Sequence, residues 1–359
     1  MRPYSVEIFD RNFLHKVHDM VSDVEYVFDY LAPAECSVTI GSSELIYVGD
    51  FIRITNGDYS YFGIVSSITR VANDQMEIGY KPFETTFETS VVFDTSMQSK
   101  PSGTALEQML KDHILANFVN NSDSYQNISA IRNISLSSTT RNWGFNLKSD
   151  KEGLERCIIN LYDVLMIRSM QKYGVRVTAV PDMSARKIDI VIGTVTTNRK
   201  TIEADLPNIL AKQITVRATS QSVNKLTVIN AANFTTKTIY YLHPDGTYNT
   251  TNTNRITPVV NQNRAVDIPN GSTWDATAAS QAADVFSEAS YNNLIELEVL
   301  NDDSLVNPAN LEIGQTVRVI HDGVSYTSIL TGKQIRETTV LTFGCIRLDL
   351  TKIIKRGGL

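Results

Sequence analysis

Few of the residues that could do acid–base or metal chemistry stand at a spacing that such chemistry requires. The chain has five histidines. His15 and His18 lie three positions apart, but no further His or Cys follows at ligand spacing, so we expect an exposed pair on a strand or loop. His113 lies on a predicted helix and His321 at a predicted hairpin turn, and neither belongs to a His-Glu-x-x-His motif. The histidines therefore predict no catalytic centre.

Other chemical motifs are equally sparse. The three cysteines are odd in number and far apart, which disfavours a disulfide framework or a zinc site: Cys36, Cys157 and Cys345. No Gly-x-Ser-x-Gly elbow or glycine-rich phosphate loop is present. Asp302 and Asp303 follow Asn301 and could hold calcium, but the stretch lacks the spacing of a calcium loop and is more typical of a turn. We predict no catalytic residue, no cofactor and no metal site, and a protein that is not an enzyme.

Composition limits the remaining functions. At 359 residues the chain is long enough for two to four domains, and its 42% hydrophobic and 20% charged residues are typical of a globular protein. A net charge of −6 disfavours a general nucleic-acid surface, and the basic stretch 352–356 is typical of a solvated chain end. No apolar run approaches the ~20 residues of a membrane span, and charges interrupt the N-terminal stretch where a secretory signal needs an apolar core. We therefore expect synthesis and assembly in a cytoplasm.

The most informative feature is an internal repeat. Residues 48–54, VGDFIRI, recur as residues 313–319, IGQTVRV, and the match between the two copies continues beyond these residues without a gap. Each copy has a Gly before alternating apolar residues and then a hairpin dipeptide, Asn56-Gly57 or Asp322-Gly323. Duplicated modules can present equivalent surfaces to a symmetric partner, so matching positions supply candidate interface residues: Arg53, Tyr61, Arg318 and Tyr326. The alternatives are two unrelated hairpins built by the same turn chemistry, and arginines that only cover each barrel.

Periodicity divides the rest of the chain. Residues 4–97 are nearly all strand, with turn signals at short and regular intervals. Helical spacing follows over 104–120, with Ser102 as a candidate N-cap, and again over about 151–172, between Asp150 and Gly174. A polar stretch separates the two helices, and strands are predicted at 175–180 and 187–192. An all-β pattern resumes near residue 214.

The predicted fold class is mainly β with α+β: two similar antiparallel β-barrels, an α+β domain and a small inserted domain. The first β-barrel is expected at 1–97 and the α+β domain at 98–207. The second β-barrel is split into 208–230 and 294–359. Residues 231–293 form the inserted domain, with an Asn/Thr-rich hairpin and an Ala-rich helix from about Ala276 to Tyr291.

The order of these modules resembles the baseplate hub, or tail-associated (Tal-type) protein, of tailed bacteriophages that infect Gram-positive bacteria. The local phrases that carry the resemblance run from end to end of the chain: residues 6–11 (VEIFDR), 49–54 (GDFIRI), 62–65 (FGIV), 328–333 (SILTGK) and 347–352 (RLDLTK). The order of these phrases, together with the split second module, carries the resemblance.

The resemblance implies a homotrimer with two barrels per subunit. Its six similar barrels would bind a hexameric distal tail ring protein. It also implies a virion location at the distal end of the tail and a channel that DNA crosses in transit. A tape-measure protein and receptor-binding proteins are further implied partners. Many family members continue into a peptidoglycan-degrading region, whereas this chain stops at Leu359, so lytic activity is not carried over.

Two other functions remain open at this point. A cell-wall hydrolase or endopeptidase could use an unrecognised site near His113 or His243. A carbohydrate-binding adhesin could stack sugars on aromatic residues of the insertion: Tyr240, Tyr241, Tyr248 and Trp274.

Overall fold

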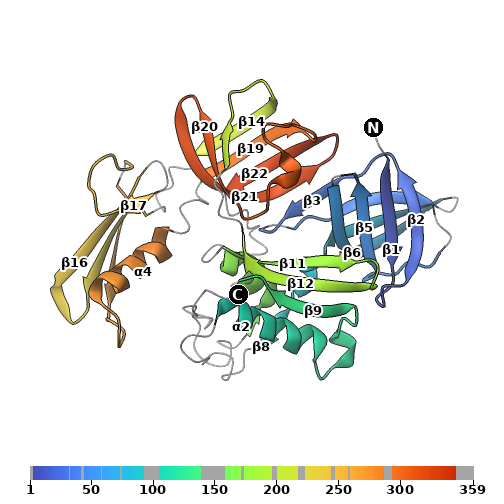
Figure 1. Ribbon diagram of the computed structural model, residues 1–359, viewed down its shortest axis with the longest axis horizontal. Helices are drawn as coiled ribbons and strands as arrows, with labels where there is room; N and C mark the ends of the chain where they lie inside the picture. Colours follow the sequence, from blue (N-terminus) through green and yellow to red (C-terminus); the bar gives the residue numbers. More distant parts are fainter. Residues whose placement is uncertain are drawn as a thin grey trace. The chain divides into compact units, whose positions relative to one another are not determined.

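The computed structural model describes residues 3–31, 33–41, 44–57, 59–72, 75–92, 105–138, 158–170, 174–195, 200–216, 223–243, 247–257, 259–286 and 293–344. Two compact units divide the chain, and each is considered by itself. The first contains residues 1–195, 332–337 and 347–359, and the second contains 196–331 and 338–346. The architecture is mainly β with α+β, as the sequence predicts (Figure 1). None of the helices in the described ranges is long and apolar enough to cross a membrane.

The first unit begins with a six-stranded antiparallel sheet in the order β2-β1-β5-β6-β7-β4. Alternating burial along β1 and β4 directs one face of the sheet inward. The two edge strands approach each other where Gly41 N donates to Asp19 Oδ2 over 2.9 Å, so the sheet curls toward closure. The strands are β1 (Tyr4–Phe9), β2 (His15–Val21), β4 (Cys36–Gly41), β5 (Phe51–Asn56), β6 (Tyr59–Ala72) and β7 (Gln75–Pro82).

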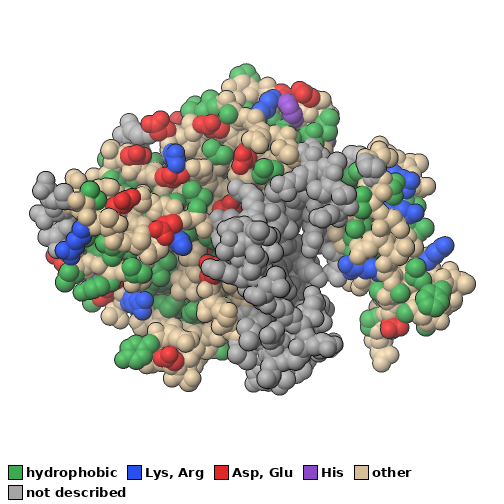
Figure 2. Space-filling view, turned by 180° about the vertical axis from the view of Figure 1, so that it is seen from behind, with side chains coloured by type: hydrophobic (Ala, Val, Ile, Leu, Met, Phe, Trp, Pro, Cys, Tyr) green, Lys and Arg blue, Asp and Glu red, His purple; other side chains and the backbone are tan. Residues whose placement is uncertain are grey.

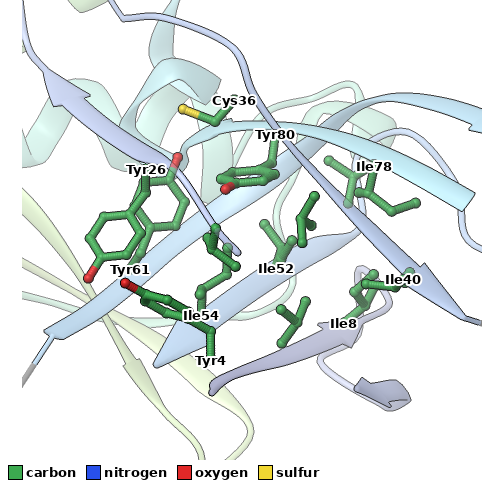
Figure 3. Close-up of a cluster of buried hydrophobic side chains, with 14 of the residues drawn as sticks. Tyr4, Ile8, Tyr26, Cys36, Ile40, Ile52, Ile54, Tyr61, Ile78 and Tyr80 are labelled. Atoms are coloured by element: carbon green, nitrogen blue, oxygen red, sulfur yellow. The ribbon is translucent and has the colours of Figure 1, made fainter. Parts of the chain in front are cut away.

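The core of this module largely separates aromatic from aliphatic side chains. Figure 3 shows tyrosines gathered toward one end and Ile8, Ile40 and Ile78 toward the other, while Ile54 lies among the tyrosines. Burying a Val, Leu or Ile side chain contributes roughly 1.5–3 kcal/mol, so the aliphatic end is a large stabilising term for the module. The labelled tyrosines are Tyr4, Tyr26, Tyr61 and Tyr80.

The α+β part of the first unit contains two small sheets. In the three-stranded sheet β11-β12-β9, β12 is antiparallel to β11 and parallel to β9. The other sheet pairs β8 with β10. The strands are β8 (Ser90–Val92), β9 (Ile131–Leu136), β10 (Ile158–Asn160), β11 (Val175–Asp182) and β12 (Lys187–Thr194), and short helical turns are η1 (Phe83–Phe87) and η3 (Ser124–Gln126).

The two predicted helices are present with different bounds. The first is α2 (Leu106–Ile114), which continues as the wider π-helical turn η2 (Leu115–Val119). The second is helical from Leu161 to Met170, including η5 (Asp163–Arg168), and it starts later than predicted because 158–160 pair with β8 as a strand. Gly174, which the sequence predicts as the stop of this helix, has φ +62°, and its N–H donates to Met170 O. Ser102, Asp150, Cys157, Cys345 and the basic stretch 352–356 lie outside the described residues.

The second unit contains the counterpart of the first sheet, in the order β13-β20-β21-β22-β19-β14. Its strands are antiparallel except β13, which runs parallel to β20. The end of β21 at residues 332–335 belongs to the first unit, where it pairs with β3 (Tyr26–Asp29). The strands are β13 (Lys200–Glu203), β14 (Ile209–Val216), β19 (Asn293–Leu300), β20 (Thr316–His321), β21 (Val324–Ile335) and β22 (Thr338–Gly344), and η7 (Pro308–Asn310) precedes β20.

The inserted domain is a four-stranded sheet, β17-β16-β15-β18, covered by α4 (Trp274–Phe286). β15 (Lys225–Asn230) was expected in the second barrel, but it pairs with β16 (Asn233–Leu242) and β18 (Asn261–Val266). The insertion therefore starts before residue 231, because Leu226 and Val228 of β15 are buried against Ala278 and Ala282 of the helix. β17 (Tyr248–Asn249) completes the sheet.

Candidate functional site: the duplicated turn and hairpin

The internal repeat has the same backbone geometry in both copies. Gly49 and Gly314 both lie in the left-handed region, at φ 93° and 89°. Gly49 N donates to Val65 O over 2.8 Å, and Gly314 N donates to Leu330 O over 2.7 Å. The two acceptors are separated by the same number of residues as the two glycines. The sequence repeat therefore corresponds to a repeated backbone hydrogen bond that joins the turn to the second strand of each hairpin.

A side-chain contact that closes the turn is repeated as well. The carboxylate of Asp50 accepts from Tyr47 N over 2.8 Å, and the amide oxygen of Gln315 accepts from Glu312 N over 3.1 Å. Each contact satisfies a backbone N–H at the entry to a strand, as turn-forming side chains commonly do. The repeat is thus one structural motif, with a charged acceptor in one copy and a neutral acceptor in the other.

The first copy adds a cation to this turn. Lys16 Nζ lies 2.7 Å from the Asp50 carboxylate, which is almost fully buried, and 3.0 Å from Leu45 O. The same ammonium group stands 4.6 Å from the centroid of the Tyr47 ring. The loop before β5 is therefore fixed by an ion pair, a carbonyl contact and a cation–π contact.

The candidate arginines occupy matching positions but have different partners. Arg53 Nη1 pairs with Glu7 Oε2 at 3.0 Å across β5 and β1, and both side chains are partly exposed. Arg318 is exposed, and its Nε donates to Ser325 Oγ over 2.6 Å across the hairpin. Both guanidinium groups remain accessible to a partner, and their role in an interface stays a prediction.

The candidate tyrosines differ more strongly. Tyr61 is 3% exposed and packs edge-on against Tyr80, with ring centroids 5.4 Å apart. Burial raises the pKa of its hydroxyl well above the ordinary value. Tyr326 is half-buried at the matching position of β21. Tyr326 therefore presents surface, whereas Tyr61 serves the core of the first module.

An ionic cluster that the sequence did not indicate fixes the turn of the second hairpin. The carboxylate of Asp205 accepts from Lys212 Nζ at 2.5 Å, from His321 Nδ1 at 2.5 Å and from Asp322 N at 2.7 Å. The hydrogen bond from Lys212, with those from Asp322 and His321, holds the pKa of this carboxyl well below its usual range. Because the Lys212 ammonium group already pairs with this carboxylate, we interpret the cluster as a structural contact that holds the hairpin turn in place. Asp205 and His321 are distant in sequence, and no local signal predicts their contact.

The remaining chemical candidates do not converge. His15 and His18 are exposed, as predicted. A bulge in the pairing of β2 with β1 places them on the same face of the sheet, where His15 is paired with Phe9 and His18 with Glu7. His113 is buried in α2, and His243 has both ring nitrogens engaged, with Asn254 O at 3.0 Å and Asn249 Oδ1 at 3.1 Å. The turn expected after β19 is present, since Asp303 Oδ1 accepts from Val306 N over 2.6 Å.

Charge is distributed without a dominant sign. On the face shown in Figure 2, acidic and basic side chains are interspersed over the described surface, and no continuous basic stripe crosses it. Phosphate-backbone binding requires a concentrated basic footprint. The visible face of the described residues therefore lacks the pattern of a general nucleic-acid surface.

Three solved structures are similar to this chain along nearly its whole length. The 43 kDa tail protein of prophage MuSo2 from Shewanella oneidensis has a TM-score of 0.56 at 12% identity, covering 96% of this chain and 98% of that chain. Prophage tail protein gp18 from Listeria monocytogenes EGD-e has a TM-score of 0.53 at 11% identity and covers 98% of both chains. The tail protein from Neisseria meningitidis MC58 has a TM-score of 0.52 at 13% identity, covering 95% of this chain and 96% of that chain.

No protein-family model and no curated protein sequence matches the chain. At 11–13% identity, the three structures establish a shared fold. The chain therefore shares its fold with phage tail proteins along nearly its whole length.

Proposed function

We propose that this chain is a non-enzymatic structural hub at the distal end of a phage tail. The observation that carries the proposal is the duplicated turn, whose backbone hydrogen bonds recur at one offset in two β-modules. A trimer of subunits with two equivalent modules each can join a six-fold ring to a three-fold tip, because three such subunits present six similar surfaces to a neighbour. The fold shared with phage tail proteins supports the same proposal.

In this proposal the chain forms a homotrimer that docks on a hexameric tail ring protein and reduces the symmetry to a three-fold tip. The resemblance to Tal-type hubs supplies the finer expectations: a channel for DNA in transit, contact with a tape-measure protein, and attachment of receptor-binding proteins. The α+β and inserted domains would line or close that channel. Membership of the Gram-positive Tal-type group rests on the sequence phrases alone.

The first test is the solution mass by light scattering coupled to gel filtration. A subunit has a mass of 40.0 kDa, so we expect a species of three times that value. A monomer at micromolar concentration that also fails to assemble on addition of the adjacent ring protein would contradict the proposal.

The second test reverses charge at the matching arginines. Arg53→Glu and Arg318→Glu should each weaken docking on the ring protein, measured by co-sedimentation. Arg53 also holds Glu7, so the swap Glu7→Arg with Arg53→Glu is the matched control that restores the internal pair while moving the positive charge. If Arg318→Glu abolishes docking and Arg53→Glu has no effect, the equivalence of the two modules fails at this position.

A further inference from the structure

A cavity of about 520 Å³ lies within the first unit, between the β-module and the α+β part. The β-module contributes Arg11, Gly49, Phe51 and Ile64, and the α+β part contributes residues 86, 89–91, 117–118 and 125–129. The volume falls in the range of ligand sites in proteins.

Among the described residues that line the cavity, Arg11 alone is charged. Its guanidinium lies against Gly49, where a Cβ atom would come within 2.4 Å of Arg11 Nη2. Within the described ranges, Arg11 has no ion pair and no side-chain hydrogen bond, unlike Arg53 and Arg132, which pair with carboxylates. The described cavity wall therefore offers one uncommitted guanidinium and no carboxylate.

The apolar part of the lining is suited to an aliphatic or aromatic side chain. Phe51 and Phe118 contribute buried ring surface. Tyr125 also lines the cavity and is 92% exposed, so its ring has almost no contact with the rest of the chain. Tyrosine has few rotatable bonds, so it supplies contact area at low entropic cost and is a common binding hot spot.

Both walls are preorganised. On one side, Asp10 Oδ1 accepts from Asn12 N at 2.9 Å and from Leu14 N at 2.8 Å, which fixes the turn that carries Arg11. On the other side, Asn121 and Asn127 bond reciprocally, at 2.8 Å and 3.1 Å, around the loop that carries Tyr125. Preorganised walls reduce the entropy that binding costs.

We propose that this cavity binds a carboxylate side chain, Asp or Glu, with an adjacent apolar residue, in an extended segment of a partner protein. A guanidinium prefers a carboxylate because two parallel N–H···O bonds form, and the apolar lining accommodates the neighbouring side chain. At the position that matches Phe51 the second module has Thr316, so this aromatic part of the lining is not repeated there. The expected stoichiometry is therefore one segment per chain.

The test uses two pools of blocked pentapeptides with randomised flanking positions and a fixed central Glu or Gln. The pools are passed over the immobilised full chain, and retained peptides are identified by mass spectrometry. Since a charge-assisted hydrogen bond contributes about 1.5–3 kcal/mol, we expect retained Glu peptides to bind at least about ten-fold more tightly than their Gln twins. Titration of a retained peptide should give one site per chain.

Arg11→Gln should remove the preference for Glu, while Arg70→Gln, at an exposed arginine outside the cavity lining, should leave it intact. Thermal unfolding of both variants checks the fold. Equal retention of the two pools, or a Glu preference that survives Arg11→Gln, would overturn the proposal. Binding of neutral tetra-N-acetylchitotetraose in this cavity, unaffected by Arg11→Gln, would instead assign it to carbohydrate.

Discussion

Gly49 and Gly314 adopt the same left-handed backbone conformation at matching positions of the repeat, and each donates its N–H to the strand that follows the hairpin turn. The next residue differs: Asp50 in one copy pairs with Lys16, while Gln315 in the other is a neutral acceptor. The duplication is therefore retained in the backbone and has diverged in the side chains. A partner that recognises the backbone or the shape can bind both modules alike, whereas a partner that recognises side-chain charge can distinguish them.

Both turn glycines should resist substitution. Gly49→Ala and Gly314→Ala each place a Cβ in the left-handed region, which costs roughly 1–2 kcal/mol. Any excess cost at Gly49 should be small, because its Cβ would meet only the far end of the exposed Arg11 side chain, which can move aside. Calorimetric unfolding should show a lower transition temperature for both variants.

Gly323→Ala is the matched control, since Gly323 has φ +73° and open space around its Cβ position. In an Arg11→Ala background, any excess cost of Gly49→Ala over this control should disappear. An excess that persists without the guanidinium would mean that the contact with Arg11 is not its cause.

The buried ion pair of the first turn should be costly to break from one side. Asp50→Gln copies the acceptor of the second module but leaves the Lys16 ammonium group without its counter-charge. Removing one partner of a buried pair typically costs about 3–5 kcal/mol, and the partial exposure of Lys16 places our expectation near the lower bound.

The double variant Lys16→Met with Asp50→Gln should recover part of that loss, because it removes the unpaired charge and keeps the acceptor for Tyr47 N. Chemical denaturation of all four proteins gives the coupling energy, expected to be about 1–3 kcal/mol. Additive effects of the two single changes would show that the pair contributes no coupling.

The sequence predicted what local chemistry determines. Gly49 and Gly314 could be identified because a left-handed turn before a strand strongly favours glycine, and alternation gave the strands of both modules. The left-handed conformation of Gly174, after the second helix, followed from the same preference. The mainly β fold class was correct for these reasons.

What could not be predicted depends on contacts distant in sequence. β15 has the same alternation as a barrel strand, and only its pairing with β16 and β18 assigns it to the inserted sheet. Tyr61 matches Tyr326 in the repeat, yet its burial depends on packing against Tyr80. Arg11 carries no local signal either, because its place at Gly49 arises only when the first turn meets the loop before β5.

One strand should connect the C-terminal part of the chain to the stability of the first module. Ile335 lies at the end of β21, is 5% exposed and belongs to the core of the N-terminal sheet. Ile335→Ala should destabilise that module by about 2–5 kcal/mol through lost burial and a cavity. Hydrogen exchange should then accelerate in β1 and β5, which lie near the opposite end of the sequence.

Leu330→Ala is the matched control for this experiment, because Leu330 is fully buried on the same strand but belongs to the second unit. It should accelerate exchange in β20 and β22 and leave β1 protected. Equal acceleration of both modules by both variants would contradict the assignment of residues 332–337 to the first unit.

A pH dependence should arise from Glu84, whose carboxyl is buried in η1 and accepts from Ala179 N over 3.1 Å. Burial raises the pKa of this carboxyl above its ordinary value of 4.5, against smaller opposing effects from the Ala179 hydrogen bond and Arg176. The folded state therefore binds the proton more tightly than the unfolded state. Protonation of Glu84 therefore stabilises the folded state in full below pH 4.5, and this stabilisation is lost as the pH rises through the folded-state pKa.

Glu84→Gln keeps an acceptor for Ala179 N and removes the titration. The variant should match the wild type near pH 4 and gain stability relative to it as the pH rises toward 7.5, measured by urea denaturation at several pH values. Glu88→Gln, at an exposed neighbour, controls for the loss of one negative charge. If the free energy of unfolding of the wild type instead rises relative to that of Glu84→Gln with increasing pH, the carboxylate is stabilised in the folded state. Burial would then not be the dominant influence on the pKa of Glu84.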